Sequence, residues 1–203
     1  MTSPATYADL LARVRTLVVE LDRPPVVGIS GHGGAGKTTL AARLAVDLGL
    51  LEAQVVSTDR FYARGAGPAS GMEDLHDWPA LLDLLERVRG RSRSDRPPRL
   101  VHPVREWDGA EGVWDVAMPH VVLVEGIRLL GPRTHRLLDL AVWIDLPPDV
   151  AAVRALRRNQ AQGDSQVELD LWHVKWVPEG EAYARSVRPE RWADVVVAAE
   201  GPP

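Results

Sequence analysis

The sequence is poor in several residue types whose absence excludes whole classes of structure. Its 203 residues include no cysteine, only two lysines and a single asparagine. A chain without cysteine forms neither disulfides nor thiolate metal sites, which fits a cytoplasmic protein. No stretch approaches the roughly 20 apolar residues of a membrane-spanning helix. Charged residues also interrupt the N-terminal region, so we expect neither a membrane association nor a signal peptide.

The chain also lacks an excess of basic over acidic residues. The net charge is −4 and the isoelectric point is about 5.9. Nucleic-acid-binding proteins usually present a basic surface, so we expect no nucleic-acid partner. Hydrophobic residues make up 45% of the chain and charged residues 26%, as in ordinary globular proteins. We therefore expect one α/β domain over residues 1–203, and a homo-oligomer is compatible with this composition.

Residues 31–38 read Gly-His-Gly-Gly-Ala-Gly-Lys-Thr and match G-x-x-x-x-G-K-[ST], the phosphate-binding loop of nucleotide-handling proteins. Glycines let the backbone wrap around a phosphate with its N–H groups pointing inward, and the following helix adds a partial positive charge. Lys37 is expected to reach the β- and γ-phosphates of ATP, and the Thr38 hydroxyl to bind Mg²⁺. The loop residues expected to bind the nucleotide are Gly31, Gly33, Gly34, Ala35, Gly36, Lys37, Thr38 and Thr39.

Five apolar runs predict the strands of a parallel sheet, because strands buried on both faces contain few polar residues. They cover residues 25–30, 54–59, 121–125, 140–145 and 194–198. Helical segments are predicted at residues 38–48, 79–88, 148–159 and 167–176, after an N-terminal helix that starts near Ser3-Pro4 and reaches Leu21. The alternation of strands and helices predicts an α/β fold whose ligands bind beyond the carboxyl ends of the strands. Residues 60–119 are less regular, with a surface connection expected over residues 89–99.

Two carboxylates follow predicted strands. Asp59 would face the γ-phosphate, where it could accept the proton of an attacking hydroxyl and help to place Mg²⁺. Glu125 comes directly after four aliphatic residues, and a charge in that position needs a partner. Mg²⁺ is one candidate partner, and Arg128 is the alternative.

Arg154, Arg157 and Arg158 follow the fourth strand on a predicted helix. Their spacing places Arg154 beside both of the others, so they could clamp phosphates and stabilise charge in a transition state. Residues 159–164 would then form the tip of a mobile lid. The alternative for each arginine is an ordinary solvated helix surface.

These motifs occur in an order that resembles the uridine kinase family, within the uridine kinase, phosphoribulokinase and pantothenate kinase group. The resemblance rests on the phosphate-binding loop and on four further elements, at residues 56–62, 124–127, 145–150 and 192–197. It implies a three-layer P-loop kinase fold, a five-stranded parallel sheet flanked by helices, with a mobile lid at about residues 154–176. It also implies that residues 60–119 form an insertion that binds the phosphate acceptor.

The resemblance further implies roles for individual residues. Asp59 is similar to the general base for a sugar 5′-hydroxyl, and Thr38, Asp59 and Glu125 would hold Mg²⁺. Asp77 resembles the acidic residue that binds ribose hydroxyls, Tyr62 would line the acceptor pocket, and Arg128 is assigned to the substrate. Lys37, Arg154 and Arg158 join Asp59 as catalytic candidates, with Asn159 where the family usually has Asp. Five tryptophans could stack on a flat ligand or pack in the core: Trp78, Trp107, Trp114, Trp172 and Trp176.

The activity implied is phosphoryl transfer from ATP, with Mg²⁺, to a primary hydroxyl such as the 5′-hydroxyl of uridine or cytidine. Residues 103–108 replace the Pro-x-Tyr-Asp element of the family, so pantothenate, nicotinamide riboside or a sugar are alternative acceptors. A nucleotide-driven switch or binding module is a further alternative. The single asparagine, Asn159, rules out an Asn-Lys-x-Asp element for guanine, and Glu125-Gly126 differs from the Asp-Glu pair of motor ATPases.

Overall fold

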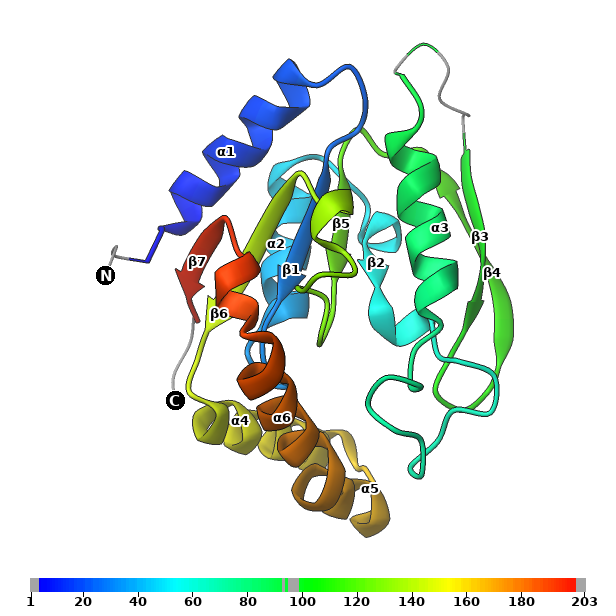
Figure 1. Ribbon diagram of the computed structural model, residues 1–203, viewed down its shortest axis with the longest axis vertical. Helices are drawn as coiled ribbons and strands as arrows, with labels where there is room; N and C mark the ends of the chain where they lie inside the picture. Colours follow the sequence, from blue (N-terminus) through cyan, green and yellow to red (C-terminus); the bar gives the residue numbers. More distant parts are fainter. Residues whose placement is uncertain (1–3, 93, 95–98, 200–203) are drawn as a thin grey trace.

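The computed structural model describes residues 4–92, 94 and 99–199. Its centre is a five-stranded parallel sheet in the order β2-β5-β1-β6-β7, which confirms the predicted fold (Figure 1). The strands are β1 (Val26–Ser30), β2 (Val56–Ser57), β5 (Val122–Glu125), β6 (Leu140–Asp145) and β7 (Val195–Ala198).

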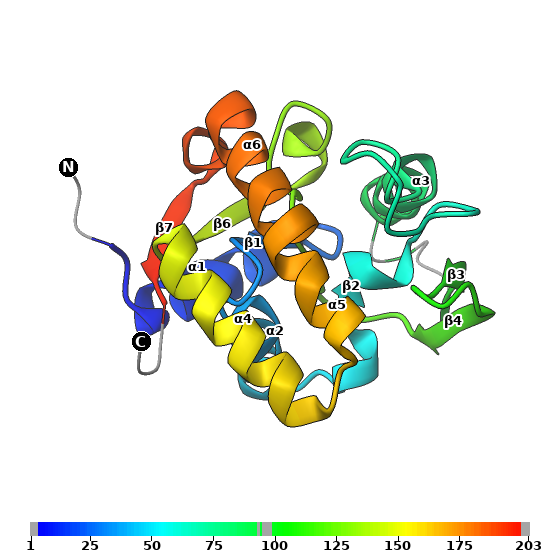
Figure 2. The same cartoon turned by 90° about the horizontal axis from the view of Figure 1, so that it is seen from below.

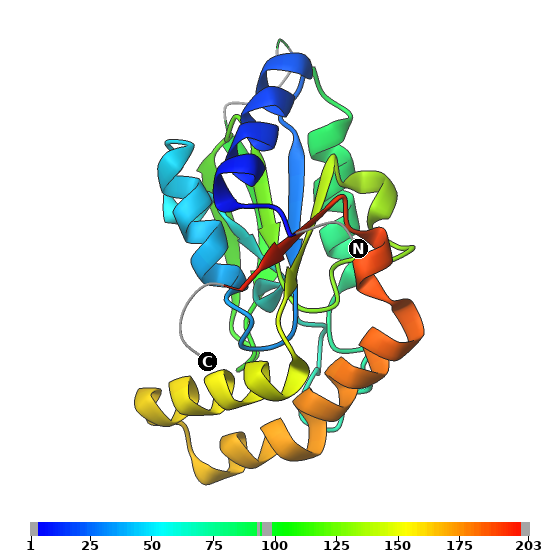
Figure 3. The ribbon, with the colours of Figure 1, turned by 90° about the vertical axis from the view of Figure 1, so that its left-hand side faces the viewer.

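Helices cover both faces of the sheet. Residues of α1 (Tyr7–Glu20) and α2 (Lys37–Asp47) pack on one face together with Val27 and Ile29. Residues of α3 (Trp78–Arg89) pack on the other face with Val26 (Figure 3). Alternate residues of β1 thus point to opposite cores, which is why this strand reads as a continuous apolar run.

The strand predictions at residues 25–30, 121–125, 140–145 and 194–198 agree with the structure within one residue. The second strand was wrong in length, because only β2 (Val56–Ser57) is extended and a 3₁₀ turn (Thr58–Arg60) follows it. The N-terminal helix begins later than predicted. Thr6 caps α1 through its side chain, which accepts a hydrogen bond from Asp9 N–H, and Ser3 lies outside the described residues.

A hairpin of β3 (Arg99–Arg105) and β4 (Glu111–Ala117) forms a second, two-stranded sheet that the sequence did not predict. Its inner side chains alternate along β3 and include Leu100 and Val104. Val101 and Pro103 lie on the outer face, and these two residues obscure the period of two. Of the predicted surface connection over residues 89–99, residues 93 and 95–98 lie outside the described part.

The C-terminal helices extend further than predicted. They are α4 (Pro148–Gln162), α5 (Gln166–Leu171), a π-helical turn (Trp172–Trp176) and α6 (Val177–Val187). Trp176 and Val177 are both helical, so the chain passes from the π-helical turn into α6 without a break, and Pro178 lies in the first turn of α6. Figure 2 shows α4 and the α5–α6 segment side by side below the sheet. Within the described residues, no helix combines the length and apolarity needed to cross a membrane.

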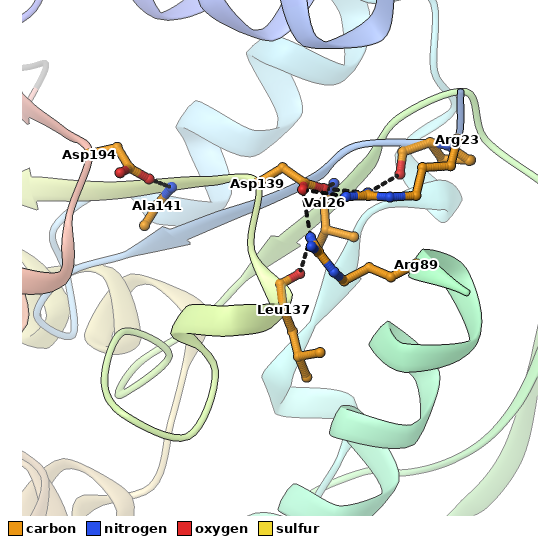
Figure 4. Close-up of polar contacts among 8 residues, drawn as sticks. Arg23, Val26, Arg89, Leu137, Asp139, Ala141 and Asp194 are labelled. Carbon is orange, nitrogen blue, oxygen red and sulfur yellow. Dashed lines mark hydrogen bonds and ion pairs between the residues drawn. The ribbon is translucent and has the colours of Figure 1, made fainter. Parts of the chain in front are cut away.

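Asp139 anchors the end of the sheet opposite to the phosphate-binding loop (Figure 4). Its carboxylate accepts hydrogen bonds from Arg23 at 2.6 Å, from Arg89 at 2.5 Å and from Val26 N–H at 2.8 Å. Burial raises the pKa of the Asp139 carboxyl, but these hydrogen bonds lower it more, so the pKa lies below its usual value. One carboxylate thereby joins β1, β6 and the end of α3.

We predict that Asp139→Asn lowers the free energy of unfolding by about 3 kcal/mol, because two largely buried arginines lose their counter-ion. Urea denaturation near pH 7 measures this loss, which should shrink as the pH falls below about 4, since a depressed carboxyl pKa stabilises only above that range. Asp83→Asn, which removes an exposed ion pair with Arg87, is the control and should cost under about 0.5 kcal/mol. Equal losses in the two variants would contradict the anchoring role.

Candidate active site

A cavity of about 450 Å³ lies at the carboxyl ends of β1, β2 and β5, where the fold class places ligands. Gly31, Asp59 and Glu125 line it from the sheet side. Residues of α4, α5, the π-helical turn and α6 line it from the opposite side: Arg158, Glu168, Trp172, Trp176, Gly180 and Tyr183.

The phosphate-binding loop contributes one end of the cavity. Gly34 and Gly36 have φ angles of +90° and +94°, a region that favours glycine, and Gly36 is the N-cap of α2. Lys37 is buried and its Nζ donates a hydrogen bond to the carbonyl of His32 at 3.0 Å. Burial lowers the pKa of the Lys37 ammonium, and the charges of Glu125 and Asp59 counteract part of this effect. The loop therefore has the glycine conformations, the lysine and the helix N-terminus that bind phosphate.

Two close contacts join this loop to the C-terminal helices. A Cβ atom on Gly34 would lie 2.1 Å from the carbonyl oxygen of Ala151 in α4. A Cβ atom on Gly33 would lie 2.8 Å from the Trp172 ring. Since real Cβ atoms do not approach so closely, glycine at both positions allows the helices to lie directly against the loop.

Asp59 lies in the 3₁₀ turn that follows β2, and its side chain is 65% exposed. Its Oδ1 is 4.0 Å from Nε2 of His76. Desolvation by the surrounding residues raises the pKa of the Asp59 carboxyl. His76, Lys37 and Arg158 lower it more, so the pKa lies below its usual value. Asp59 is thus an accessible, ionised carboxylate next to the lysine of the phosphate-binding loop.

Glu125 ends β5 and is 4% exposed. Burial raises the pKa of its carboxyl, while Lys37 and the hydroxyls of Ser57 and Thr38 lower it in part. The alternative partner, Arg128, instead donates a hydrogen bond to Glu179 at 2.6 Å. Thr38, Asp59 and Glu125 supply oxygen atoms to one cavity, and a partly compensated carboxylate fits a divalent cation.

Among the described residues, no three His, Cys, Asp or Glu side chains are grouped to hold a metal ion by themselves. Mg²⁺ is usually held by one or two carboxylates together with water and substrate phosphates, so the oxygen donors present are compatible with that metal.

The predicted arginines differ in position. Arg158 lines the cavity, and its charge lowers the pKa values of Lys37 and Asp59. Its guanidinium also donates to Asn159 Oδ1 at 2.9 Å, and Asn159 in turn donates to Asp164 at 2.6 Å. Arg154 is not among the residues that line the cavity. The structure therefore brings Arg158, and not Arg154, to the site.

Only some of the predicted substrate residues line the cavity. Tyr62 and Arg128 line the cavity, whereas Asp77 does not. The Asp77 carboxylate caps α3 by accepting a hydrogen bond from Ala80 N–H at 3.0 Å. Asp77 therefore has a structural role in this conformation, which is the common alternative for an aspartate before a helix.

The five candidate tryptophans divide into core and cavity residues. Trp107, Trp172 and Trp176 line the cavity. Trp78 and Trp114 are 6% and 4% exposed and pack in the core. Thr39 lies on the far side of the phosphate-binding loop, in a second cavity that Ala35 and Gly36 also line.

Three further residues belong to the site, although no sequence motif indicated them. His76 is buried beside Asp59 and stacks on Tyr62, with ring centroids 5.3 Å apart. Glu106 and Tyr183 line the cavity from the hairpin and from α6. Both lie in elements that the sequence did not predict, so only the fold places them.

Comparisons with known proteins agree with this geometry. No protein-family model matches the chain. The chain is 26% identical over 194 residues to the uridine kinase of Lactobacillus helveticus, with 90% of each chain covered. It is 28% identical over 190 residues to the uridine kinase of Geobacillus kaustophilus, covering 86% of this chain and 90% of that one.

Solved structures show the same fold. A kinase assigned to fructose transport in Silicibacter sp. TM1040 matches with a TM-score of 0.72 and 21% identity, over 95% of this chain and 98% of that one. A protein assigned as a uridine kinase in Bacillus stearothermophilus matches with a TM-score of 0.58 and 19% identity, over 93% and 98%. The chain has a P-loop kinase fold and is a small-molecule kinase. Its predicted resemblance to the uridine kinase family is confirmed.

We predict that Gly34→Ala costs more stability than Gly36→Ala. Both substitutions place a side chain at positive φ, which costs about 1–2 kcal/mol, but only the Gly34 variant meets a backbone atom, while nothing lies within 4 Å of a Cβ on Gly36. Urea unfolding should show an additional loss of about 2 kcal/mol or more for Gly34→Ala, in the range of overpacked sites. Indistinguishable variants would contradict the contact between the loop and α4.

Proposed function

We propose that this kinase transfers the γ-phosphoryl group of ATP, with Mg²⁺, to a primary hydroxyl, namely the 5′-hydroxyl of a nucleoside. The observation that carries this proposal is the cavity shared by Lys37 and Asp59. A phosphate-binding lysine and an accessible ionised carboxylate in one cavity are the two groups that phosphoryl transfer to an alcohol requires.

Asp59 is the proposed general base. Its carboxylate accepts the proton of the attacking hydroxyl, whose oxygen then forms a bond to the γ-phosphorus as the bond to the leaving ADP oxygen breaks. The pKa of Asp59 lies below its usual value, so the carboxylate is ionised at neutral pH. Lys37 and Arg158 are positioned to stabilise the negative charge on the transferring group.

Thr38, Asp59 and Glu125 are the proposed residues that hold Mg²⁺, which when bound neutralises charge on the ATP phosphates. Burial raises the pKa of Glu125 and Lys37 compensates only in part, so a divalent ion near it would further favour the ionised form. Gly31 and residues 33–39 of the loop are proposed to bind the phosphates. Arg154 is proposed as a catalytic residue only if α4 moves, because it does not line the cavity in this conformation.

The acceptor is proposed from the relatives and from the cavity lining. The curated relatives are named uridine kinases, and Tyr62, Trp107 and Trp176 offer aromatic surfaces for a nucleoside base. A sugar is the second candidate acceptor, because the structure with a TM-score of 0.72 is assigned to a fructose transport system.

We predict that Asp59→Asn lowers kcat at least about 100-fold, because the amide cannot accept the proton. ADP release coupled to NADH oxidation, with uridine, cytidine and fructose as acceptors, measures the activity. Asp74→Asn, on the loop before α3 and outside the cavity lining, serves as the control and should retain full activity. Near-normal turnover by Asp59→Asn would exclude Asp59 as the base, and release of ADP without any acceptor would exclude the kinase assignment.

We further predict that Glu125→Gln raises the Mg²⁺ concentration needed for half-maximal activity about tenfold or more, since it removes a proposed anionic ligand. A Mg²⁺ titration at saturating ATP measures this shift. Glu168→Gln, which removes another carboxylate that lines the same cavity, is the matched control and should leave the titration unchanged. An unchanged midpoint in Glu125→Gln would remove Glu125 from the metal site.

A further inference from the structure

Glu106 is a carboxylate that the phosphoryl-transfer chemistry does not use. It follows β3 directly and opens the turn of the hairpin, where its N–H donates to the carbonyl of Ala110 at 2.9 Å. Gly109, at a φ of +84°, closes the turn by donating to the carbonyl of Glu106 at 3.0 Å. The turn thus fixes the backbone from which Glu106 and Trp107 line the cavity.

The hairpin is itself fixed to the segment that follows Asp59. Tyr62 N–H donates to the carbonyl of Arg105 at 3.2 Å, and the Arg105 guanidinium donates to the carbonyl of Tyr62 at 3.0 Å. These bonds hold Glu106 at a constant position relative to Tyr62, and therefore relative to the proposed base.

One oxygen of the Glu106 carboxylate is open to a ligand. Oε1 accepts a hydrogen bond from Arg60 Nε at 3.2 Å. Within the described part of the chain, Oε2 receives no hydrogen bond, and the Glu106 side chain is 45% exposed. An ionised carboxylate oxygen accepts hydrogen bonds and donates none.

Aromatic rings line the same cavity as this carboxylate and the proposed base. The Trp107 ring meets Tyr62 at 5.2 Å and 61°, and Trp176 at 5.5 Å and 70°. Tyr62 comes three residues after Asp59, and its N–H donates to the carbonyl of Arg105, the neighbour of Glu106, which links it to the segments of both carboxylates. A flat ring joined to a hydroxyl at Asp59 would therefore pack on these side chains with an edge toward Glu106.

Resting on the proposed function, we propose that Glu106 selects acceptors whose ring presents an amino group at that edge over acceptors that present a carbonyl. An amino group donates a hydrogen bond to the free carboxylate oxygen. A carbonyl at the same position would place its oxygen next to the carboxylate oxygen. Both atoms accept hydrogen bonds, so both would lack a donor in a partly desolvated site. Cytidine has an amino group and uridine a carbonyl at the same ring carbon, and the adjacent ring nitrogen is an acceptor in cytidine and an N–H donor in uridine, so the pair tests which pattern of donors Glu106 accepts at that edge. The chain would then favour cytidine, although its curated relatives are named for uridine.

The test compares kcat/KM for cytidine and for uridine in the unaltered protein, in Glu106→Gln and in Glu111→Gln. We expect a preference for cytidine of about tenfold or more in the unaltered protein, as for hydrogen bonds to charged groups. A glutamine amide can donate or accept, so in Glu106→Gln the ratio should fall to within about threefold of one. Glu111 accepts from Arg105 at 2.9 Å on the same hairpin but does not line the cavity, so Glu111→Gln should keep the original ratio.

The ratio is insensitive to a general loss of stability or catalysis, because both nucleosides meet the same protein. A measurable turnover with uridine equal to or better than cytidine would overturn the assignment of Glu106, and so would a cytidine preference that Glu106→Gln leaves unchanged. Each of these results would leave the proposed nucleoside kinase activity intact. Failure to phosphorylate either nucleoside, with ADP release on another acceptor, would overturn both proposals.

Discussion

The close approach of β2 and β5 at their carboxyl ends is the constraint on which the site depends. A Cβ atom on Gly126 would lie 1.9 Å from Oγ1 of Thr58, so only glycine allows the chain after β5 to pass the chain after β2. Ser57 and Glu125 are partners in the register of these strands; Thr58 and Gly126 follow them directly, and Asp59 comes next after Thr58. Two carboxylates, one in the turn after β2 and one at the end of β5, thereby line one cavity beside Lys37.

The C-terminal helices complete this cavity through backbone contact as well as side chains. The carbonyl of Ala151 occupies the space that a side chain on Gly34 would need, and Trp172 occupies the space beside Gly33. Lys175 and Arg128 both donate to Glu179, while Arg128 also donates to the carbonyl of Met72 at 3.1 Å. The helices that close the cavity are therefore linked both to the phosphate-binding loop and to the loop that precedes α3.

Several features could be predicted from the pattern of residues in the sequence because local chemistry determines them. The phosphate-binding loop needs glycine where φ is positive, and the parallel strands need continuous apolar runs. The hairpin was not predicted because Val101 and Pro103 on its outer face disrupt the alternation of apolar and polar residues along β3. Helix α6 was not predicted, although it continues directly from the π-helical turn with Pro178 as its second residue.

The sequence by itself determined the fold class, through the alternation of apolar runs and helical segments along the chain. It also determined the phosphate-binding loop and the two carboxylates, Asp59 after β2 and Glu125 at the end of β5, because each of these follows from one short segment. Only the tertiary structure decided which candidates share a cavity. It placed Arg158 there and left out Arg154, four residues earlier on α4, and it turned Asp77 into a helix cap. It also brought Glu106 and His76 to the site from segments far along the chain from Lys37. Neighbours of this kind depend on strand register and helix packing, which no local sequence pattern encodes.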